Sequence, residues 1–371
     1  MPTLPPLDVP LIAAPMAGGP STPALVAAVA EAGAMGFLAG GYLTAEAFDE
    51  QLTDLRSRSD RPFGANLFLP APPDPDPGHA TARAAAVRDY GARLQQDAAR
   101  HGVELGEPRI DDDAVDAKIA VLARHRPAVV SVTFALPSSE RYAALRDTGA
   151  CLVATVTSVA EARAAEVQGV DALWVQGREA GGHRGVHVDP GGDPEAGAEP
   201  LERLLPAIRT ATDLPIVAAG GLHDGRGIAR MLALGATAVG LGTAFLGAPE
   251  AGTSATHRAA LRAGGRDTVV TRAFTGRPAR ALVNRFTREH STAAPAAYPE
   301  LHHLTRPLRA AASRAGDAEA VHLWAGTGYH AVTEEPAGEV VARLDRERRA
   351  ADGNGPSPTG DGPRTSLGDQ K

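Results

Sequence analysis

The sequence contains a single cysteine, Cys151, among its 371 residues. One cysteine excludes an internal disulfide and makes a cysteine-based metal site implausible, so a reducing cytoplasm is the expected location. Cys151 opens an apolar run that ends at Val156. We therefore predict that Cys151 is a small buried hydrophobic residue.

Lysine is nearly absent, since it occurs only as Lys118 and Lys371, and the formal net charge is −7. No basic stripe with interleaved aromatic residues is present, which argues against nucleic-acid binding. No segment approaches 18 consecutive apolar residues, and residues 1–9 lack a basic stretch followed by an apolar one. Neither a membrane span nor a secretory signal is expected, so the sequence predicts a soluble, intracellular protein.

Short apolar runs alternate along the chain with longer alanine-rich amphipathic stretches, which is the pattern of βα units around a parallel sheet. Eight strands are predicted, at residues 11–14, 34–38, 63–69, 128–133, 152–155, 172–175, 216–219 and 238–241. Hydroxyl residues suited to capping helix starts are Thr22, Thr44 and Ser158. Glycines suited to ending helices are Gly33, Gly149, Gly169 and Gly235. Eight such units predict an α/β fold, the (β/α)8 TIM barrel.

Two regions interrupt this repeat. Residues 70–108 begin with a proline-rich run and become helical from about residue 81 to 101, which predicts an insertion after the third strand. Residues 248–349 look mostly helical, so we expect a C-terminal addition packed on a barrel of residues 1–247. Residues 350–371 are rich in Gly, Pro, Asp and Ser and are expected to be disordered.

Glycines follow the seventh and eighth predicted strands. Gly220 and Gly221 follow strand seven, and Gly242 and Thr243 follow strand eight. The active site of such a barrel lies at the carboxyl ends of its strands, and a missing Cβ lets backbone N–H groups approach an anion. Each glycine alone could simply make a tight turn, but their occurrence after two adjacent strands predicts a phosphate site.

The loop after the sixth strand, residues 176–185, has the sequence QGREAGGHRG and places His183 between glycines. An imidazole with a pKa near neutrality can accept a proton from a carbon acid, although a loop histidine can also merely hydrogen-bond the backbone. His187 lacks the glycine frame. No carboxylate completes a metal site with these two histidines, so no metal site is predicted.

Two amide side chains and several arginines complete the candidates. Asn66 lies in the third strand and Gln176 ends the sixth. Both amides can offer a donor and an acceptor to a heterocyclic ring, although an isolated buried amide more often satisfies nearby backbone. Arginines could attract an anionic substrate, although most surface arginines in proteins are simply solvated. The candidates are Arg178, Arg184, Arg272, Arg277, Arg280 and Arg285.

Five motifs, in this order, resemble the nitronate monooxygenase family, formerly called 2-nitropropane dioxygenase. They are APMAGG at 14–19, GANL at 64–67, the QGREAGGHRG loop at 176–185, AAGGL at 218–222 and GLGTAF at 240–245. A weaker similarity is the sequence WAGTG at 324–328, where family members often have glutamine at the position of Thr327. The likeness extends from about residue 10 to residue 247.

The resemblance implies a flavoprotein oxidoreductase that uses FMN and O2 to convert alkyl nitronates, with nitroalkanes as a further substrate class, into carbonyl compounds and nitrite. It implies that His183 is the catalytic base. It also implies FMN ring contacts from Pro15, Met16, Ala17, Asn66 and Gln176, close approach by Gly181 and Gly182, and phosphate contacts from Gly220, Gly221, Gly242 and Thr243. The partners are then a small-molecule substrate and O2, and a homodimer is left open.

Three alternative functions remain open. An FMN-dependent NAD(P)H reductase of the same superfamily, acting on an enoyl-acyl-carrier protein or a quinone, shares the histidine loop. A non-redox phosphate-binding barrel such as an aldolase needs a Schiff-base lysine or a carboxylate base. Lys118 lies in a predicted helix and Lys371 in the tail, which disfavours the lysine mechanism. The third alternative is a flavin-binding protein without turnover.

Overall fold

The structure is a computed structural model that describes residues 3–71 and 76–353. Eight parallel strands close into a barrel in the order β1-β2-β3-β4-β5-β6-β8-β9, which confirms the predicted TIM barrel. The barrel strands are β1 (Leu11–Ala13), β2 (Met35–Ala39), β3 (Gly64–Phe68), β4 (Val129–Thr133), β5 (Cys151–Val156), β6 (Ala172–Gln176), β8 (Ile216–Ala219) and β9 (Ala238–Leu241). Each of the eight predicted strands coincides with one of them.

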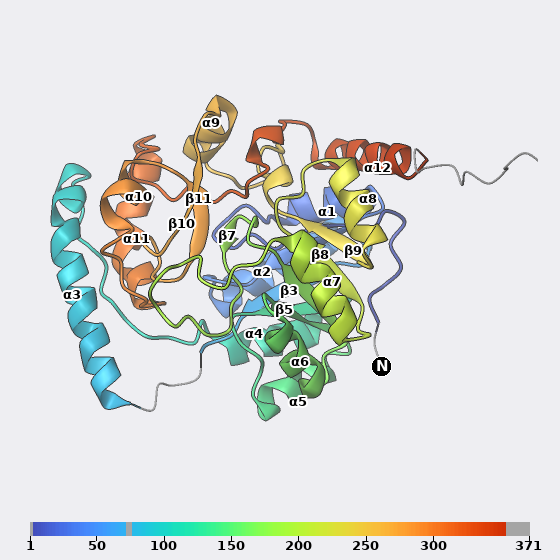
Figure 1. Cartoon of the computed structure of the whole chain (residues 1–371), viewed down its shortest axis with the longest axis horizontal. Coiled ribbons are helices and arrows are strands. Elements are labelled where there is room, and N and C mark those ends of the chain that lie inside the picture. Colours follow the sequence, from blue (N-terminus) through green and yellow to red (C-terminus); the bar gives the residue numbers. More distant parts are fainter. Residues whose placement is uncertain (1–2, 72–75, 354–371) are drawn as a thin grey trace, which may run out of the picture.

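Helices cover the outside of the barrel (Figure 1). They are α1 (Pro23–Glu31), α2 (Ala45–Arg58), α4 (Val115–His125), α5 (Ser139–Asp147), α6 (Val159–Gln168), α7 (Leu201–Ala211), α8 (Gly225–Ala233) and α12 (Ala337–Gly353). The hydroxyls of Thr22, Thr44 and Ser158 accept backbone N–H groups of the first turns, as predicted. The predicted helix-ending glycines all have positive φ, which L-residues with a Cβ rarely adopt: Gly33, Gly149, Gly169 and Gly235.

Helix α12 packs against α8 and α1, so it closes the ring of barrel helices. Its side chains Val340, Val341 and Leu344 belong to the same buried apolar layer as the other barrel helices. The boundary predicted after residue 247 therefore separates α12 from the helices with which it packs. The predicted disordered tail, 350–371, lies outside the described residues from 354 onward, and residues 350–353 belong to α12.

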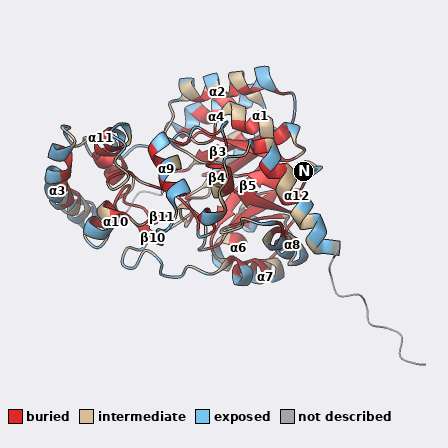
Figure 2. Cartoon of the chain, turned by 90° about the horizontal axis from the view of Figure 1, so that it is seen from above, coloured by how far each residue is buried: buried red, intermediate tan, exposed pale blue. Residues whose placement is uncertain are grey.

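The barrel interior is filled by side chains that alternate along the strands with those facing the helices. Cys151 and Val153 of β5 pack inside the barrel with Phe37 and Trp174, while Leu152 faces the helices. Cys151 is fully buried, as predicted, and burial raises the pKa of its thiol to about 12. Figure 2 shows the barrel strands as a continuous buried interior.

A second layer, called the cap here, lies beside the barrel in both views (Figures 1 and 2). It comprises α3 (Pro77–Arg100), β10 (Thr268–Thr271), β11 (Ala279–Leu282), α10 (Arg285–His290) and α11 (Glu300–Arg314). Helix α3 lies in the predicted insertion. The strands were not predicted: β10 and β11 form an antiparallel sheet with the two-residue strand β7 (Gly182–His183). The remaining described helices are α9 (Ala255–Ala263) and the short 3-10 turns η1 (Thr243–Phe245) and η2 (Tyr329–Ala331).

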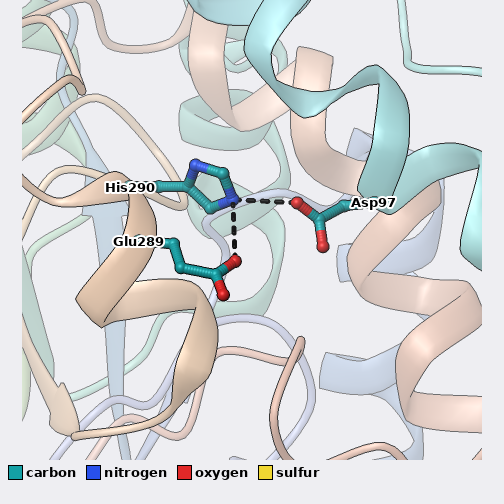
Figure 3. A group of neighbouring side chains, drawn as sticks. All are labelled: Asp97, Glu289 and His290. Atoms are coloured by element: carbon teal, nitrogen blue, oxygen red, sulfur yellow. Dashed lines mark hydrogen bonds and ion pairs between the residues drawn. The ribbon is translucent and has the colours of Figure 1, made fainter.

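An ion-pair network fastens α3 to α10 within the cap (Figure 3). Nε2 of His290 lies 2.8 Å from Asp97 and 4.0 Å from Glu289. Arg285 contacts the same two carboxylates, at 2.7 Å from Asp97 and 2.5 Å from Glu289. Although the three side chains in Figure 3 could surround a metal ion, the Arg285 guanidinium already supplies the positive charge that the carboxylates need. The group therefore serves to attach the insertion to the C-terminal part of the chain.

Among the described residues, no helix combines the length and the hydrophobicity that a bilayer crossing would require.

Candidate active site

A cavity of about 650 Å³ lies at the carboxyl ends of the barrel strands, beneath the cap. The twelve residues that the sequence singled out all line it: Pro15, Met16, Ala17, Asn66, Gln176, Gly181, Gly182, His183, Gly220, Gly221, Gly242 and Thr243. They come from the carboxyl ends of five different barrel strands and the loops that follow them, so the closed barrel is what brings them together.

One end of the cavity is a cradle of backbone N–H groups from the loops after β8 and β9. Gly220 and Gly221 have φ values of +132° and +70°, which only glycine adopts without strain. In the described part of the chain, the N–H groups of Gly220, Gly221 and Gly242 have no hydrogen-bond acceptor. Unpaired N–H groups at the end of a barrel are suited to an anion such as phosphate.

The first turn of α8 does not contribute to this cradle. A helix N-terminus near Asp224 could add its dipole to the cradle, but the N–H of Gly225 donates to Glu347 of α12, 2.9 Å away. The Asp224 side chain accepts the N–H of Gly227 at 2.8 Å. Carboxylates of the protein therefore already occupy the start of α8, and the anion cradle consists of loops.

The histidine loop is held by backbone pairing with the cap. His183 lies in β7, opposite Ala279 of β11. Gly181 packs against the loop at 324–328: a Cβ at this position would lie 2.4 Å from the backbone nitrogen of Gly326. Gly181 is thus required by the close approach of two backbones, and the WAGTG segment at 324–328 lies directly beside the histidine loop.

The His183 side chain is half-buried in the cavity wall, and its Nε2 lies 2.9 Å from Oγ1 of Thr275. The Thr275 hydroxyl is also within 3.4 Å of the Arg277 carbonyl oxygen. Aromatic rings surround the imidazole, with centroids 5.4 to 6.5 Å away: Tyr42, Phe68, Phe134, Tyr298 and Trp324. This apolar enclosure limits the access of water to the ring.

Burial, together with the charges of Arg277 and Arg309, lowers the pKa of His183 to about 3. The imidazole is therefore neutral at physiological pH. A neutral ring can accept a proton, but it cannot attract an anion by its own charge.

The two predicted amides have different surroundings. Asn66 is buried, and its Nδ2 donates to Ser131 and Thr133, which leaves its Oδ1 without a partner among the described residues. Gln176 donates from Nε2 to the His183 carbonyl at 3.0 Å and accepts the Gly185 N–H at 2.7 Å. Gln176 therefore organises the histidine loop, and a contact from it to a flavin ring would depend on its remaining N–H.

Most of the arginines proposed as anion attractors serve other purposes. Arg272 pairs with Asp189 at 2.6 Å and Arg280 with Glu195 at 2.7 Å. Arg285 pairs with Asp97 and Glu289. Arg184 donates to the carbonyls of Pro194 and Ala196, and Arg178 lies 3.8 Å from Glu179. Arg277 is buried, with its guanidinium carbon 3.9 Å from the ring centre of Phe134.

The residues that sequence reasoning missed are chiefly in the cap. Thr275, His302 and Arg309 line the cavity, but no spacing rule connects them to the barrel loops. Tyr42 also lines it, with an unusual φ of +69°. Its backbone N–H donates to Asp113 at 3.0 Å, and Asp113 pairs with the buried Lys118 at 2.7 Å.

A barrel that joins an anion cradle to a half-buried histidine at the carboxyl ends of its strands has the architecture of a cofactor-binding barrel enzyme. The sequence model of the nitronate monooxygenase family matches residues 6–347. The chain belongs to the nitronate monooxygenase family, whose members are flavin-dependent oxidoreductases.

Individual relatives agree with this assignment. The chain is 38% identical to a nitronate monooxygenase of Paraburkholderia phytofirmans over 92% of both chains. It is 34% identical to a probable nitronate monooxygenase of Bacillus subtilis, over 89% of this chain and 92% of the relative.

Solved structures give the same picture. The nitroalkane oxidase of Streptomyces ansochromogenes superposes with a TM-score of 0.88 at 47% identity, over 94% of this chain and 97% of that one. FabK of Thermotoga maritima is more distant, with a TM-score of 0.69 at 25% identity over 94% of both chains.

Proposed function

We propose that the chain is an FMN-dependent nitronate monooxygenase, which uses O2 to convert alkyl nitronates into carbonyl compounds and nitrite. The observation that carries this proposal is a neutral, half-buried His183 in the same cavity as an unpaired N–H cradle. Neutral nitroalkanes are a second substrate class, for which His183 removes the α-proton. The likeness to a nitroalkane oxidase and to nitronate monooxygenases supports this choice.

The cavity fits FMN by three observations. The unpaired N–H groups of Gly220, Gly221 and Gly242 suit a phosphate. The free Oδ1 of Asn66 can accept a ring N–H, and the loop of Pro15 to Ala17 lines the same space. When bound there, FMN supplies the electron-transfer chemistry, while the protein contributes binding, orientation and electrostatics.

The hydrogen bonds around His183 suggest which nitrogen acts as the base. If the Thr275 hydroxyl donates to the Arg277 carbonyl, its oxygen accepts the N–H at Nε2 of His183. Nδ1 is then the unprotonated nitrogen that receives the α-proton of a nitroalkane. A preformed nitronate requires no proton transfer, so the base function of His183 is used only with neutral nitroalkanes. The aromatic rings around the imidazole exclude water from the reacting carbon.

Anaerobic titration of the purified protein tests this function. The protein should be yellow with bound FMN, and ethyl nitronate should change the flavin spectrum in the absence of oxygen. In air, ethyl nitronate should support oxygen uptake with release of nitrite. NADH and NADPH should bleach the flavin slowly or not at all. Rapid bleaching by NAD(P)H without nitronate-dependent oxygen uptake would instead identify an FMN-dependent NAD(P)H reductase, the alternative that the sequence leaves open. A cytoplasmic location and a homodimer stay predictions.

A further inference from the structure

Helix α11 places a buried cation on the wall of the cavity. Arg309 is only 7% exposed and lines the cavity. Its Nε donates to Oγ1 of Thr305 and its Nη2 to the carbonyl of His302, both at 2.9 Å. Within residues 3–71 and 76–353, Nη1 has no hydrogen-bond acceptor, and no carboxylate forms an ion pair with this guanidinium.

Among the described residues, Arg309 is the buried arginine that both lacks a carboxylate partner and lines the cavity. Arg272 and Arg280 each contact a carboxylate within 2.7 Å. Arg277 has none, but its guanidinium packs on the Phe134 ring and donates to the Val186 carbonyl, and it does not line the cavity. Arg309 is therefore the buried cation that the cavity presents to a ligand.

The groups around Arg309 do not balance its charge. Burial lowers its pKa to about 10, so it stays cationic at neutral pH. Burial and nearby positive charge also lower the pKa values of His183, His302 and His322, which are therefore neutral. Burial raises the pKa of Tyr42 to about 12, so its phenol is neutral as well. A buried charge without a counter-charge is costly, and an anionic ligand would remove that cost.

We propose that Arg309 binds the negatively charged nitro end of the substrate and thereby makes the enzyme select nitronate anions over neutral nitroalkanes. The inference rests on the proposed function and assigns the specificity to one residue. The two nitronate oxygens share the negative charge, so one of them can accept a charge-assisted hydrogen bond from the free Nη1 of Arg309. His183 and Arg309 then divide the work: the neutral imidazole handles the proton, and the guanidinium holds the anion.

Nitrate is the probe, because it is a planar inorganic anion that shares the nitro geometry and is not oxidised. The test compares Arg309→Met, which removes the charge, with Arg309→Lys, which keeps it. Arg306→Gln is the matched control, since Arg306 lies on the same helix and lines the same cavity but is exposed to solvent. For each FMN-loaded protein, the Kd of nitrate is measured by perturbation of the flavin spectrum, and KM by oxygen uptake with ethyl nitronate and with nitroethane.

Arg309→Met should raise both the nitrate Kd and the nitronate KM roughly 10- to 100-fold, which is the usual effect of losing a hydrogen bond to a charged group. The nitroethane KM should change much less. Arg309→Lys should recover a substantial part of the nitrate affinity, and Arg306→Gln should bind nitrate almost as wild type does, because an exposed charge is screened.

An unchanged nitrate Kd in folded, FMN-loaded Arg309→Met would overturn the proposal even if nitronate oxidation is confirmed. Conversely, a protein without nitronate turnover that binds nitrate through Arg309 would reject the proposed function and retain the anion site. If Arg309→Met does not fold, wild-type crystals soaked in bromide decide the question. Anomalous density beside the Arg309 guanidinium supports the site, and bromide bound only elsewhere in the cavity contradicts it.

Discussion

Replacing His183 by asparagine should separate the two substrate classes. The change removes the proton acceptor but leaves the cradle of Gly220, Gly221 and Gly242, so the variant should retain FMN. Turnover of nitroethane requires removal of an α-proton, whereas ethyl nitronate has already lost it. We therefore expect a large loss with nitroethane and a small loss with ethyl nitronate.

The structure sets the magnitude of this effect. A positioned general base typically contributes 10²- to 10⁴-fold, so kcat/KM for nitroethane should fall by at least about 100-fold. The nitronate value should fall less than about tenfold, since no proton transfer is lost. Lowering the pKa of His183 from 6.5 to about 3 weakens the imidazole as a base by on the order of 5 kcal/mol. The wild-type enzyme should therefore already prefer the nitronate.

The direction of the pKa shift also fixes the pH dependence. A lowered pKa favours the neutral imidazole, which is lost only when the pH falls toward 3. Between pH 5 and pH 8, His183 should thus contribute no titration to kcat/KM for ethyl nitronate. Oxygen uptake with freshly diluted substrates gives both rate constants across this range, with FMN content measured for every protein.

His187→Asn is the matched control for the histidine variant. His187 lies on the same loop, but its ring contacts the Thr155 carbonyl at 2.9 Å and does not line the cavity. This control should retain most of the nitroethane activity. Equal losses of nitroethane and nitronate turnover in FMN-loaded His183→Asn would refute the role of His183 in proton abstraction, and so would a nitroethane rate that survives the change.

Three further substitutions test the surroundings of the site. Thr275→Val should reduce kcat/KM for nitroethane roughly fivefold, because it removes one hydrogen bond to the imidazole. Thr275→Ser should keep the wild-type kcat/KM in the same oxygen assay. An unaltered rate in the valine variant would rule out this orienting role. Gly181→Ala should yield little folded, FMN-loaded protein on purification, since its Cβ would lie 2.4 Å from the Gly326 nitrogen, and a normal flavin content would contradict that. Lys118→Met should lower the free energy of unfolding in urea by about 3–5 kcal/mol, because it leaves the Asp113 carboxylate without its ion-pair partner. Adding Asp113→Asn should recover part of this stability. A loss under about 1 kcal/mol would show that the pair is unimportant.

Much of the barrel could be predicted because its signals are local. Each strand is a short buried run, and several helices start or end with a residue whose side chain or backbone suits that position. Thr22 and Gly169 illustrate the two ends. Closure of a parallel sheet then places the ends of all strands together, so the loops after β1, β3, β6, β8 and β9 converge without any knowledge of individual contacts.

The cap could not be predicted in the same way, because its contacts join parts of the chain that are far apart. The sheet that holds His183 pairs residue 183 with residue 279, and Asp97 of α3 is fastened to α10 nearly two hundred residues later. Helix α12 looked like part of the C-terminal addition because its sequence shows that it is amphipathic but not which helices it packs against.

The sequence by itself determined the barrel and the convergence of the glycine loops with the loop that carries His183, since these depend on periodicity and on backbone conformation. Only the tertiary structure decided the charge state and surroundings of that histidine. Its low pKa arises from burial and from Arg277 and Arg309, whose distance from residue 183 is set by packing of the cap. The same packing leaves Arg309 without a carboxylate partner among the described residues. Electrostatic energies depend on distances in space, which spacing along the chain does not specify.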